Sequence, residues 1–296
     1  MKNTVSVIVN YHNGEKYLEN CIKSILNQNY KDFEVILWDN ASTDNSKKIT
    51  EKFKDKRIKY FRHPTKENLY KARNRAIEVS SGKFIAFLDS DDWWEENYLS
   101  SREKFFSDSK IDFLYCNTNI FYEKKQKKKL YRKFKLPCGK IFSNLSKDYF
   151  IIISGVIFKR EIFKKYGNFN QNYNILGDYD YIMKISKLCN AHATNLPLLN
   201  YRIHENNFLK LHSQLFYEEY KDWYERTEKE KNPDFFENKD YLMNKLINLE
   251  IRFLLKNKKK NISILLKILN HKIFKEKIKL LILFFLPKSF FKYIRK

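Results

Sequence analysis

Three aspartates follow an apolar run in the first third of this sequence. Residues 84–88 are apolar, and Asp89, Ser90, Asp91 and Asp92 come directly after them. Carboxylates this close repel one another unless a positive charge lies among them. At the carboxyl end of a strand, where open α/β sheets bind ligands, a divalent cation that carries phosphate would supply that charge. The other interpretation is a solvated acidic turn in which Asp92 is the N-cap of a following helix.

Similar polar clusters follow two other strand-like runs. Residues 10–13 follow the β-branched run at 5–9, and residues 39–44 follow an apolar run at 33–38. Because parallel strands end at the same edge of a sheet, the three clusters would lie close together. Their convergence favours a ligand site over a chance cluster of acids.

The elements that would position these clusters alternate along the chain. β-Branched and aromatic runs predict strands, and apolar residues at helical spacing predict the helices between them. The expected strands are 5–9, 33–38, 58–61 and 84–88, and the expected helices are 18–26, one from Ser42 or Thr43 to about residue 53, and one that carries Ala72, Ala76 and Val79. This alternation predicts an α/β fold with a doubly wound, mostly parallel sheet and helices on both faces.

The second half of the chain is less regular. The elements expected there are strands at 111–116, 151–158 and 198–203, a hairpin that pairs 119–122 with 130–134 around a basic tip at 126–129, and a helix that begins near Asp178. From about residue 208 the pattern is helical and charged. We therefore expect an α/β domain at 1–207 and a helical, basic C-terminal region at 208–296.

Basic residues are concentrated in that C-terminal region. Residues 251–296 hold 14 Lys and Arg but a single acid. Their net charge, 14 − 1 = +13, is more than half of the net charge of the chain, which is +23. The apolar run at 280–286 is far shorter than the ~20 residues that cross a bilayer. A basic, amphipathic segment of this kind is typical of a helix that lies in a membrane interface. The alternative is a helical cap whose apolar face packs on the α/β domain.

Cysteine usage and missing motifs narrow the class of protein. The four cysteines form no CxxC pair and no signal peptide is visible, so we expect reduced thiols and a cytoplasmic protein, peripheral on the inner face of the cell membrane. HExxH, GxxxxGK[ST], GxGxxG and GxSxG are all absent. A zinc protease, a P-loop enzyme, a dinucleotide-binding enzyme and a serine hydrolase are therefore excluded.

Several motifs then occur in a specific order. They are the strand and loop at 5–13, W-D-N-A-S-T-D at 38–44, A-R-N at 72–74, L-D-S-D-D at 88–92, S-G-V-I-F-K-R-E at 154–161, Y-G-N-F at 166–169 and Y-R-I-H at 201–204. Together they resemble family 2 glycosyltransferases, the inverting group with the GT-A fold, over about residues 4–205. The resemblance implies a nucleotide-sugar donor, with UDP favoured as its nucleotide, and L-D-S-D-D corresponds to the family's DxD element.

The resemblance also implies roles for single residues. Those implied to bind the donor nucleotide are Tyr11, Asp39, Arg73, Asp89 and Arg202. Asp39 would accept a hydrogen bond from the nucleobase, Arg73 would lie near the nucleotide, Asp89 would face the ribose, and Arg202 would contact the phosphates.

The resemblance further implies a divalent cation on the diphosphate. Asp91 would ligate Mg²⁺ or Mn²⁺, and His204 would contact the metal or the diphosphate. Asp92 would assist the metal or act as a helix N-cap. Of the two tryptophans that follow, one or both would pack in the core, and either could stack on a sugar face.

Inversion by a single displacement requires a base for the acceptor hydroxyl. The family's E-D pair carries it on the second acid, and the matching residues here are Gly177 and Asp178. Asp178 is therefore the predicted base, and the first acid of the pair is missing. Asp180 is the competing candidate, and a helix N-cap is the alternative role of Asp178.

The hypothesis that follows is a metal-dependent, inverting glycosyltransferase of the hexosyltransferase type. It would move a sugar from a nucleotide sugar to a cell-surface glycan or lipid-linked saccharide in polysaccharide biosynthesis, with no nucleic acid as partner. One alternative is a nucleotidyltransferase of similar sheet architecture, although residues 10–14 are not its Gly-rich loop. The other is a non-enzymatic basic module that binds membrane or nucleic acid.

Overall fold

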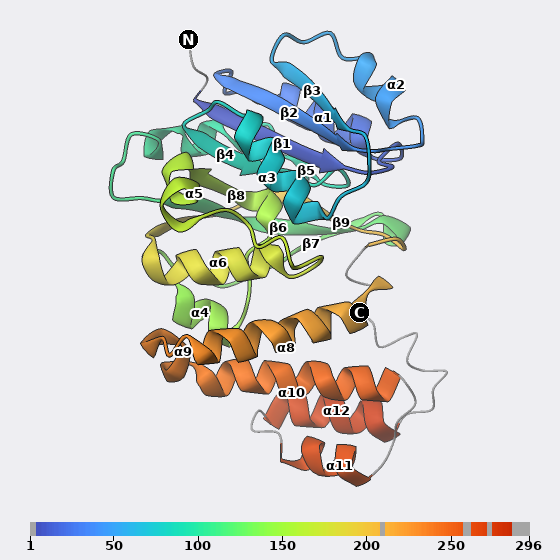
Figure 1. Cartoon of the computed structure of the whole chain (residues 1–296), viewed down its shortest axis with the longest axis vertical. Helices are drawn as coiled ribbons and strands as arrows, with labels where there is room; N and C mark the ends of the chain where they lie inside the picture. Colours follow the sequence, from blue (N-terminus) through green and yellow to red (C-terminus); the bar gives the residue numbers. More distant parts are fainter. Residues whose placement is uncertain (1–3, 208–210, 257–261, 271–273, 286–296) are drawn as a thin grey trace. The chain divides into compact units, whose positions relative to one another are not determined.

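The chain forms two compact units (Figure 1). The computed structural model describes residues 4–207, 211–256, 262–270 and 274–285. The first unit comprises Met1–Leu145 and Tyr149–Asn207, and the second comprises Ser146–Asp148 and Phe208–Lys296.

The first unit is built on a nine-stranded sheet whose order is β3-β2-β1-β4-β8-β6-β9-β5, with β7 paired to β6. The strands are β1 Val5–Tyr11, β2 Phe33–Asn40, β3 Ile58–His63, β4 Phe84–Phe87, β5 Trp93–Trp94, β6 Phe113–Tyr122, β7 Lys127–Leu130, β8 Val156–Lys159 and β9 Ala191–Ile203. The first four strands are parallel to one another, as is the β6–β9 pair, whereas β5, β7 and β8 run antiparallel to their partners. The predicted mostly parallel sheet is confirmed.

Helices cover this sheet and complete its core. They are α1 Leu18–Leu26, α2 Ser46–Glu51, α3 Leu69–Val79, α4 Phe142–Lys147, α5 Arg160–Tyr166 and α6 Gly177–Leu188. Alternate residues of β1, among them Val5, Val7 and Val9, pack with Leu18 and Ile22 of α1 in one buried cluster. The intervening residues of β1 point to the other face, since side chains of a strand alternate.

Two expected elements of this unit are shorter than predicted. α2 begins at Ser46 rather than at Ser42 or Thr43, because the Ser42 and Ser46 hydroxyls accept hydrogen bonds from the backbone N–H groups of Asn13 and Gly14. Of the expected strand at 151–158, residues 153–155 form a 3₁₀ turn and β8 begins only at Val156.

The predicted hairpin is also different. Residues 119–122 pair with β7, which is the lysine-rich segment that we expected at the tip, instead of with 130–134. The turn is formed by Glu123–Lys125 and by Gln126, whose φ of 48° lies in the left-handed region. All four residues of β7 are exposed. A lysine-rich segment has the same sequence pattern in an exposed strand as in a solvated turn, so the sequence did not distinguish the two.

A buried carboxylate ties β2 to its neighbours on the sheet. Glu34 is fully buried, and its Oε1 accepts hydrogen bonds from Ser6 Oγ at 2.6 Å and from the Ser81 backbone N–H at 2.5 Å. Lys59 Nζ lies 2.6 Å from its Oε2. Burial alone would raise the pKa of Glu34, but the bonds from Lys59, Ser6 and Ser81 outweigh it and lower that pKa to about 2.

Glu34→Gln should therefore destabilise the protein in a pH-dependent way. Because the folded-state pKa of about 2 lies below the unfolded value, the ionised carboxylate contributes stability above about pH 4.5 that is lost as the pH falls toward 2. We expect a loss of roughly 2–3 kcal/mol at pH 7 in urea unfolding, narrowing between about pH 5 and pH 2. Glu19→Gln, at an exposed pair with Lys23, is the matched control. A pH-independent loss would contradict the assigned charge.

The second unit is helical. Its helices are α8 Ser213–Lys229, α9 Pro233–Glu237, α10 Lys239–Lys256, α11 Ile262–Leu269 and α12 Phe274–Phe285. The last three share a buried apolar cluster that includes Ile251, Ile264, Ile268, Leu280 and Leu283. Thus each of these helices has one apolar face turned inward.

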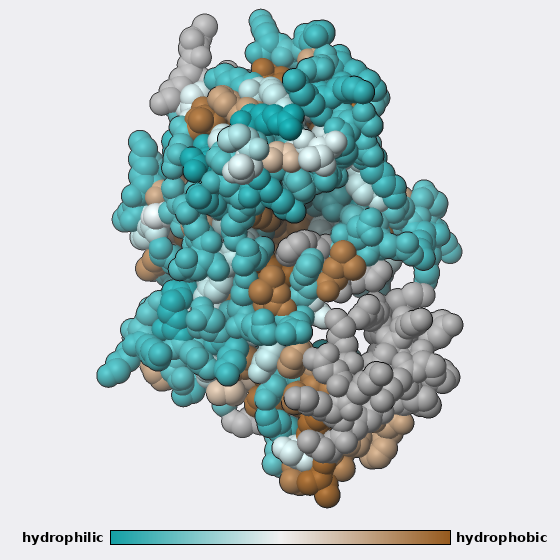
Figure 2. Space-filling model, turned by 45° about the vertical axis from the view of Figure 1, so that its right-hand side comes forward, coloured by the Kyte–Doolittle hydropathy of each residue, from teal (hydrophilic) through white to brown (hydrophobic). Residues whose placement is uncertain are grey.

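α11 and α12 each carry a second apolar stripe that is exposed. The two stripes, at i, i+4 and i+7 spacing, consist of Ile262, Leu266 and Leu269 on α11, and Ile278, Ile282 and Phe285 on α12. Their exposure reaches 77% at Ile262 and 70% at Phe285. Apolar side chains are visible as brown surface at the end of the molecule in Figure 2. Within the described residues, no helix has the length and apolarity needed to cross a membrane.

Candidate active site

The loops after β1 and β2 are joined by side-chain hydrogen bonds. Asn13 Oδ1 accepts from the Thr43 backbone N–H at 2.8 Å, and the Glu15 backbone N–H donates to Asp44 at 3.0 Å. His12 Nδ1 lies 2.9 Å from the Asn40 carbonyl oxygen. The two polar clusters predicted to converge do so.

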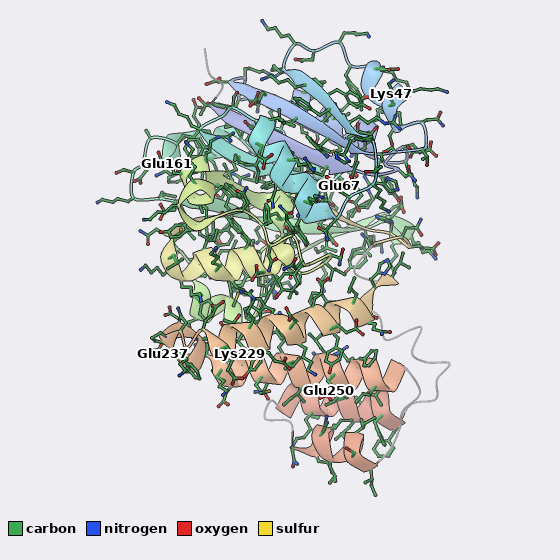
Figure 3. All side chains as sticks on the ribbon, in the orientation of Figure 1. Lys47, Glu67, Glu161, Lys229, Glu237 and Glu250 are labelled. Carbon is green, nitrogen blue, oxygen red and sulfur yellow. The ribbon has the colours of Figure 1, made fainter. Side chains whose placement is uncertain are left out.

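The start of α3 is fixed to the same edge. The Asn40 side chain exchanges two hydrogen bonds with the backbone of Glu67, at 2.8 and 2.9 Å. Glu67 is labelled in Figure 3, beside the beginning of α3. Its carboxylate pairs with Lys71 at 2.9 Å and with Arg75 at 2.8 Å. The strand β2 thereby positions the helix that carries the A-R-N motif.

Asp39 is fully buried at the end of β2. Its Oδ1 accepts from the Ser42 backbone N–H at 2.7 Å, and its Oδ2 accepts from the Tyr60 hydroxyl at 2.9 Å. Burial and Asp39 together raise the pKa of Tyr60 to about 12. Tyr11 lies nearby with 3% of its surface exposed, and burial and Asp39 raise its pKa also. Nucleobase recognition by Asp39 and a nucleotide contact of Tyr11 stay predictions.

Arg73 of α3 joins the donor and acceptor sides of the predicted site. One of its terminal nitrogens lies 2.5 Å from Asp89 Oδ1, and the other donates to Asp178 Oδ1. Only 1% of the Arg73 side chain is exposed, whereas Asp178 keeps 26%. The guanidinium therefore holds two predicted site residues, which come from opposite halves of the domain, around one point.

The charges in this cluster perturb one another. Desolvation raises the pKa of Asp89 to about 6; Arg73 opposes the shift, and Asp91 and Asp178 add to it. Burial alone would lower the pKa of Arg73, but Asp178 and Asp89 reverse the shift and raise it. Arg73 thus supplies positive charge to Asp89 and Asp178.

Asp91 faces the residues at the end of β9. Its Oδ2 lies 2.9 Å from His204 Nε2, and its backbone carbonyl oxygen accepts from Arg202 Nε at 2.9 Å. The Arg202 guanidinium lies over the rings of Tyr17 and Trp93, 4.6 Å from each centroid. The structure brings Asp91, His204 and Arg202 together, and metal binding by Asp91 and His204 stays a prediction. Phosphate binding by Arg202 stays a prediction.

Asp92 does not cap a helix. The residues that follow it form β5, so the N-cap interpretation is wrong. Asp92 Oδ1 accepts from the Arg202 backbone N–H at 2.9 Å, and Oδ2 is buried without a hydrogen-bond partner among the described residues. Burial raises the pKa of Asp92 well above its usual value, with Asp91 and Asp89 as further causes. An unsatisfied buried carboxylate oxygen costs free energy, which a nearby cation would reduce.

The residues present fit a divalent cation in part. Asp91 and His204 supply two ligands of suitable type, and a diphosphate would supply others. Within the described ranges, no group of three or more His, Cys, Asp and Glu side chains is arranged to hold a metal alone. A site of this kind depends on the donor to complete the coordination.

The two tryptophans have different positions. Trp94 is 3% exposed, stacks on Tyr98 with ring centroids 3.8 Å apart, and donates through Nε1 to the Ser154 carbonyl oxygen at 2.7 Å. Trp93 is half-buried beside Arg202, with Lys128 Nζ 5.4 Å from its ring centroid. Trp94 is a core residue, and only Trp93 reaches the site.

Asp178 lies in the first turn of α6, where the helix N-terminus favours negative charge. The N-cap position belongs to Leu176, so the N-cap interpretation of Asp178 is wrong. Asp180 lies one half-turn further on and is 8% exposed. The more accessible Asp178 is the better placed of the two acids to meet a substrate.

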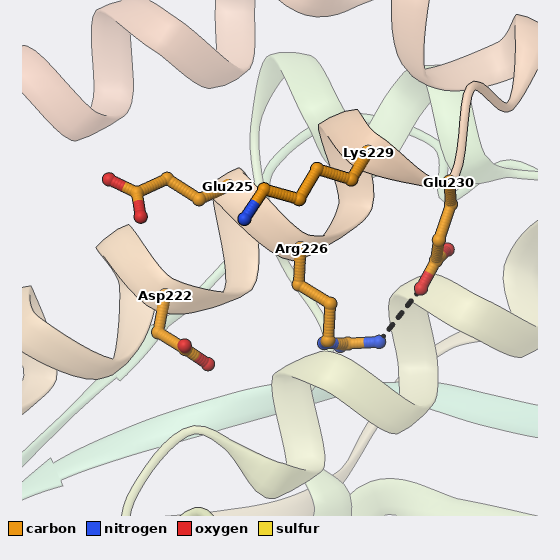
Figure 4. Close-up of a pocket in the computed structure, with 5 residues that line it drawn as sticks. All are labelled: Asp222, Glu225, Arg226, Lys229 and Glu230. Carbon is orange, nitrogen blue, oxygen red and sulfur yellow. Dashed lines mark hydrogen bonds and ion pairs between the residues drawn. The ribbon is translucent and has the colours of Figure 1, made fainter.

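The second unit has a hollow on its surface. It is lined by Asp222, Glu225, Arg226 and Lys229 of α8 and by Glu230, which directly follows the helix, as Figure 4 shows. Arg226 pairs with Glu230 at 2.9 Å across one helical turn. Charged residues on successive turns of an exposed helix form such pairs commonly, so we assign it no function.

A known protein family matches the part of the chain that carries most of these motifs. The profile of Glycosyl transferase family 2 matches residues 6–167, which is more than half of the chain. The chain belongs to glycosyl transferase family 2. The match ends before Asp178 and before the strand end at 201–204, so the family assignment rests on the donor-side motifs.

Curated relatives of this family are similar over shorter stretches. Two from Escherichia coli are named UDP-Glc:alpha-D-GlcNAc-diphosphoundecaprenol beta-1,3-glucosyltransferase, WfaP and WfgD. WfaP is 36% identical over 116 residues, 39% of this chain and 46% of WfaP. WfgD is 34% identical over 140 residues, 47% of this chain and 55% of WfgD. The chain thus spans about half the length of these relatives.

Solved structures of low sequence identity share the fold. Mannosyltransferase PcManGT from Pyrobaculum calidifontis, in complex with GDP-Man and Mn²⁺, has a TM-score of 0.63 at 16% identity, covering 99% of this chain and 83% of that one. S. aureus TarS 1-349 has a TM-score of 0.57 at 20% identity, covering 99% and 73%. The expected GT-A-like fold, with additional C-terminal helices, is confirmed.

Proposed function

We propose that the chain is a metal-dependent, inverting glycosyltransferase that uses a nucleotide sugar, with UDP as the favoured nucleotide. The acceptor would be a hydroxyl of a lipid-linked saccharide. Family membership supports the reaction class. WfaP and WfgD, whose names give UDP-Glc as donor and a diphosphoundecaprenol-linked sugar as acceptor, support both substrate classes.

The observation that carries this proposal is the Arg73 bridge. A single displacement requires a leaving group on one side of the sugar and a base on the other. Asp89, assigned to the donor, and Asp178, assigned to the acceptor, bind the same guanidinium. The sugar's reacting carbon would therefore lie near the residues that Arg73 holds.

In the proposed reaction, the acceptor oxygen attacks the anomeric carbon of the donor. Asp178 takes the proton of that hydroxyl, while the bond from the anomeric carbon to the diphosphate oxygen breaks and its electron pair goes to the leaving nucleoside diphosphate. Asp178 pairs with Arg73, and its exposure of 26% leaves it accessible to a hydroxyl. A divalent cation bound by Asp91 and His204 would offset the charge on the leaving group.

A transfer assay tests the proposal. UDP-Glc, UDP-GlcNAc, UDP-Gal and GDP-Man would each be incubated with Mn²⁺ and a GlcNAc-diphospholipid acceptor. We expect a nucleoside diphosphate as product, a sugar of inverted anomeric configuration by NMR, and loss of transfer with EDTA. In a parallel assay with UTP and glucose 1-phosphate, release of pyrophosphate would indicate a nucleotidyltransferase instead. Absence of transfer together with absence of a thermal shift by any nucleotide sugar would contradict the proposal.

We further propose that α11 and α12 bind the cytoplasmic face of a membrane peripherally. Their exposed apolar stripes alternate with lysines, including Lys267, Lys277 and Lys279. Lysines near an anionic bilayer attract it, and apolar side chains that enter the interface lose their contact with water. Peripheral binding would bring the enzyme to a lipid-linked acceptor.

The triple variant Leu266→Ser, Ile282→Ser and Phe285→Ser should lose at least tenfold in affinity for vesicles that contain phosphatidylglycerol. Each removed side chain contributes on the order of 1 kcal/mol or more when buried in the interface. Flotation of protein with liposomes measures the bound fraction. Leu196→Ser, at a residue of β9 that is 51% exposed, is the control. Equal flotation of the triple variant and this control would exclude the stripes as the membrane contact.

A further inference from the structure

Gly177, which replaces the first acid of the family's pair, lies against the ring of Tyr70. A Cβ added at Gly177 would come within 2.6 Å of Cγ, Cδ2 and Cε2 of that ring. These atoms lie at the root and along one edge of a rigid ring, so no rotation about the ring axis would move Cγ away. Any side chain at position 177 would therefore displace Tyr70 or the start of α6.

The ring of Tyr70 is held in place from several sides. It is 1% exposed, and its centroid lies 5.9 Å from that of Phe169 and 5.7 Å from the Arg73 guanidinium carbon. The Asn74 side chain exchanges two hydrogen bonds with the Phe169 backbone, at 2.9 and 3.1 Å. The helix α3 and the segment before α6 are thereby tied together around the buried ring.

We infer that Tyr70 fills the space of the missing acid and acts as a positioning residue for Asp178. The ring supports the first turn of α6 through Gly177, and Arg73 holds the Asp178 carboxylate directly. Gly177 is then required because only glycine admits the ring. The inference rests on the proposed function, since it treats Asp178 as the base. It also implies that the acceptor is oriented without an acid at position 177.

A double-mutant cycle tests this coupling. Gly177→Ala should lower kcat at least tenfold while the donor KM changes little, since a base displaced by ~1 Å loses about 10²-fold in rate. In the Tyr70→Ala background the same Gly177→Ala change should cost less than twofold, because the clash is gone. Tyr70→Phe keeps the ring and should therefore have a higher kcat than Tyr70→Ala. The acidic limb of the pH profile of kcat should also lie closer to that of the wild type in Tyr70→Phe than in Tyr70→Ala.

Tyr181→Ala provides the matched background. Tyr181 is equally buried on α6 but stacks on Phe163, with centroids 5.0 Å apart. There Gly177→Ala should keep its full penalty. Additive effects of Tyr70→Ala and Gly177→Ala on kcat, or an effect confined to the donor KM, would overturn the inference.

Thermal unfolding of the same variants separates the possible failures. Coupling in the unfolding midpoint without coupling in kcat would show a structural contact only, which overturns the positioning role. If Asp178→Asn kept wild-type transfer, Asp178 would not be the base, although the contact between Tyr70 and Gly177 would still hold. If Gly177→Ala does not fold, Tyr70→Ala with Gly177→Ala takes its place, because alanine at position 70 has no Cγ. Failure of that pair to fold would contradict the assigned clash.

Discussion

Asp178→Asn should lower kcat by about 10²–10⁴-fold, the contribution of a general base. Asparagine keeps the shape of the side chain and can still accept a hydrogen bond from Arg73, but it cannot take the proton of the acceptor hydroxyl. The donor KM should change by no more than a few fold, because the proposed role of Asp178 is on the acceptor side. Initial rates at saturating acceptor, with the donor varied, measure both quantities.

Asp180→Asn is the discriminating control for this prediction. It removes the charge of the competing acid on the same helix, two residues further along. Unfolding midpoints are compared first, because Asp180 is the more buried of the two. At equal folded fraction we expect Asp180→Asn to retain transfer. A larger loss of kcat in Asp180→Asn than in Asp178→Asn would move the base to Asp180.

Arg73→Gln should have the widest effect of any single substitution in the site. It would leave Asp89 and Asp178 facing each other without the cation that both bind. Removal of one partner of a buried charge pair costs about 3–5 kcal/mol of folding stability. The value of kcat/KM should fall by at least about 10²-fold, since a donor residue and the base both lose their fixed position. Urea unfolding and initial rates measure the two effects.

Arg75→Gln is the matched control on the same helix. Its side chain is 41% exposed, and the carboxylate of Glu67, to which it pairs, is 8% exposed and also pairs with Lys71 at 2.9 Å. Because Arg75 is solvated and Glu67 keeps Lys71 as a partner, the loss should be about 1 kcal/mol at most, and this variant should unfold close to the wild type. A similar stability of Arg73→Gln and Arg75→Gln would contradict the role given to the buried bridge.

The positions of the residues assigned to the donor could be predicted from the sequence because they depend on local pattern. Asp39, Asp89 and Asp91 each follow a strand whose apolar run is readable, and parallel strands bring their ends to one edge. We could infer in this way the four parallel strands, the helices between them and the motifs at the strand ends. The family resemblance assigned Asp91 to a metal and His204 to the metal or the diphosphate, and the structure adds the contact between the two side chains.

The acceptor half could be predicted as residues but not as geometry. Arg73 and Asp178 were both singled out, yet nothing showed that they bind each other across 105 positions. Their meeting depends on how α3 packs on the segment before α6, through bonds such as Asn68 Nδ2 to the Tyr173 carbonyl oxygen at 2.7 Å. Long-range packing of this kind leaves no periodic signal. The role of Tyr70 beside Gly177 was missed for the same reason.

The predicted helix starts were wrong where a side chain forms a tertiary hydrogen bond instead of a local capping bond. Ser42 was a good capping residue by type, but its hydroxyl serves the loop after β1. Asp92 was a good capping residue too, yet it binds the Arg202 backbone and lies before a strand. Both side chains accept a hydrogen bond from a backbone N–H, as a capping residue does, but the N–H belongs to a distant segment of the chain. Tertiary contacts therefore replaced the local capping bonds.

The three lysines of β7 bear on the solubility of the folded chain. β7 pairs with β6 alone among the described strands, so its other side offers unpaired backbone N–H and C=O groups to any extended segment from another molecule. Lysines along such a strand repel the same strand of a second copy at low ionic strength. At about 1 M salt, where the Debye length is about 3 Å, that repulsion is screened. Concentrated salt would thus remove a kinetic barrier to sheet-to-sheet association while the buried apolar contacts of the fold stay intact.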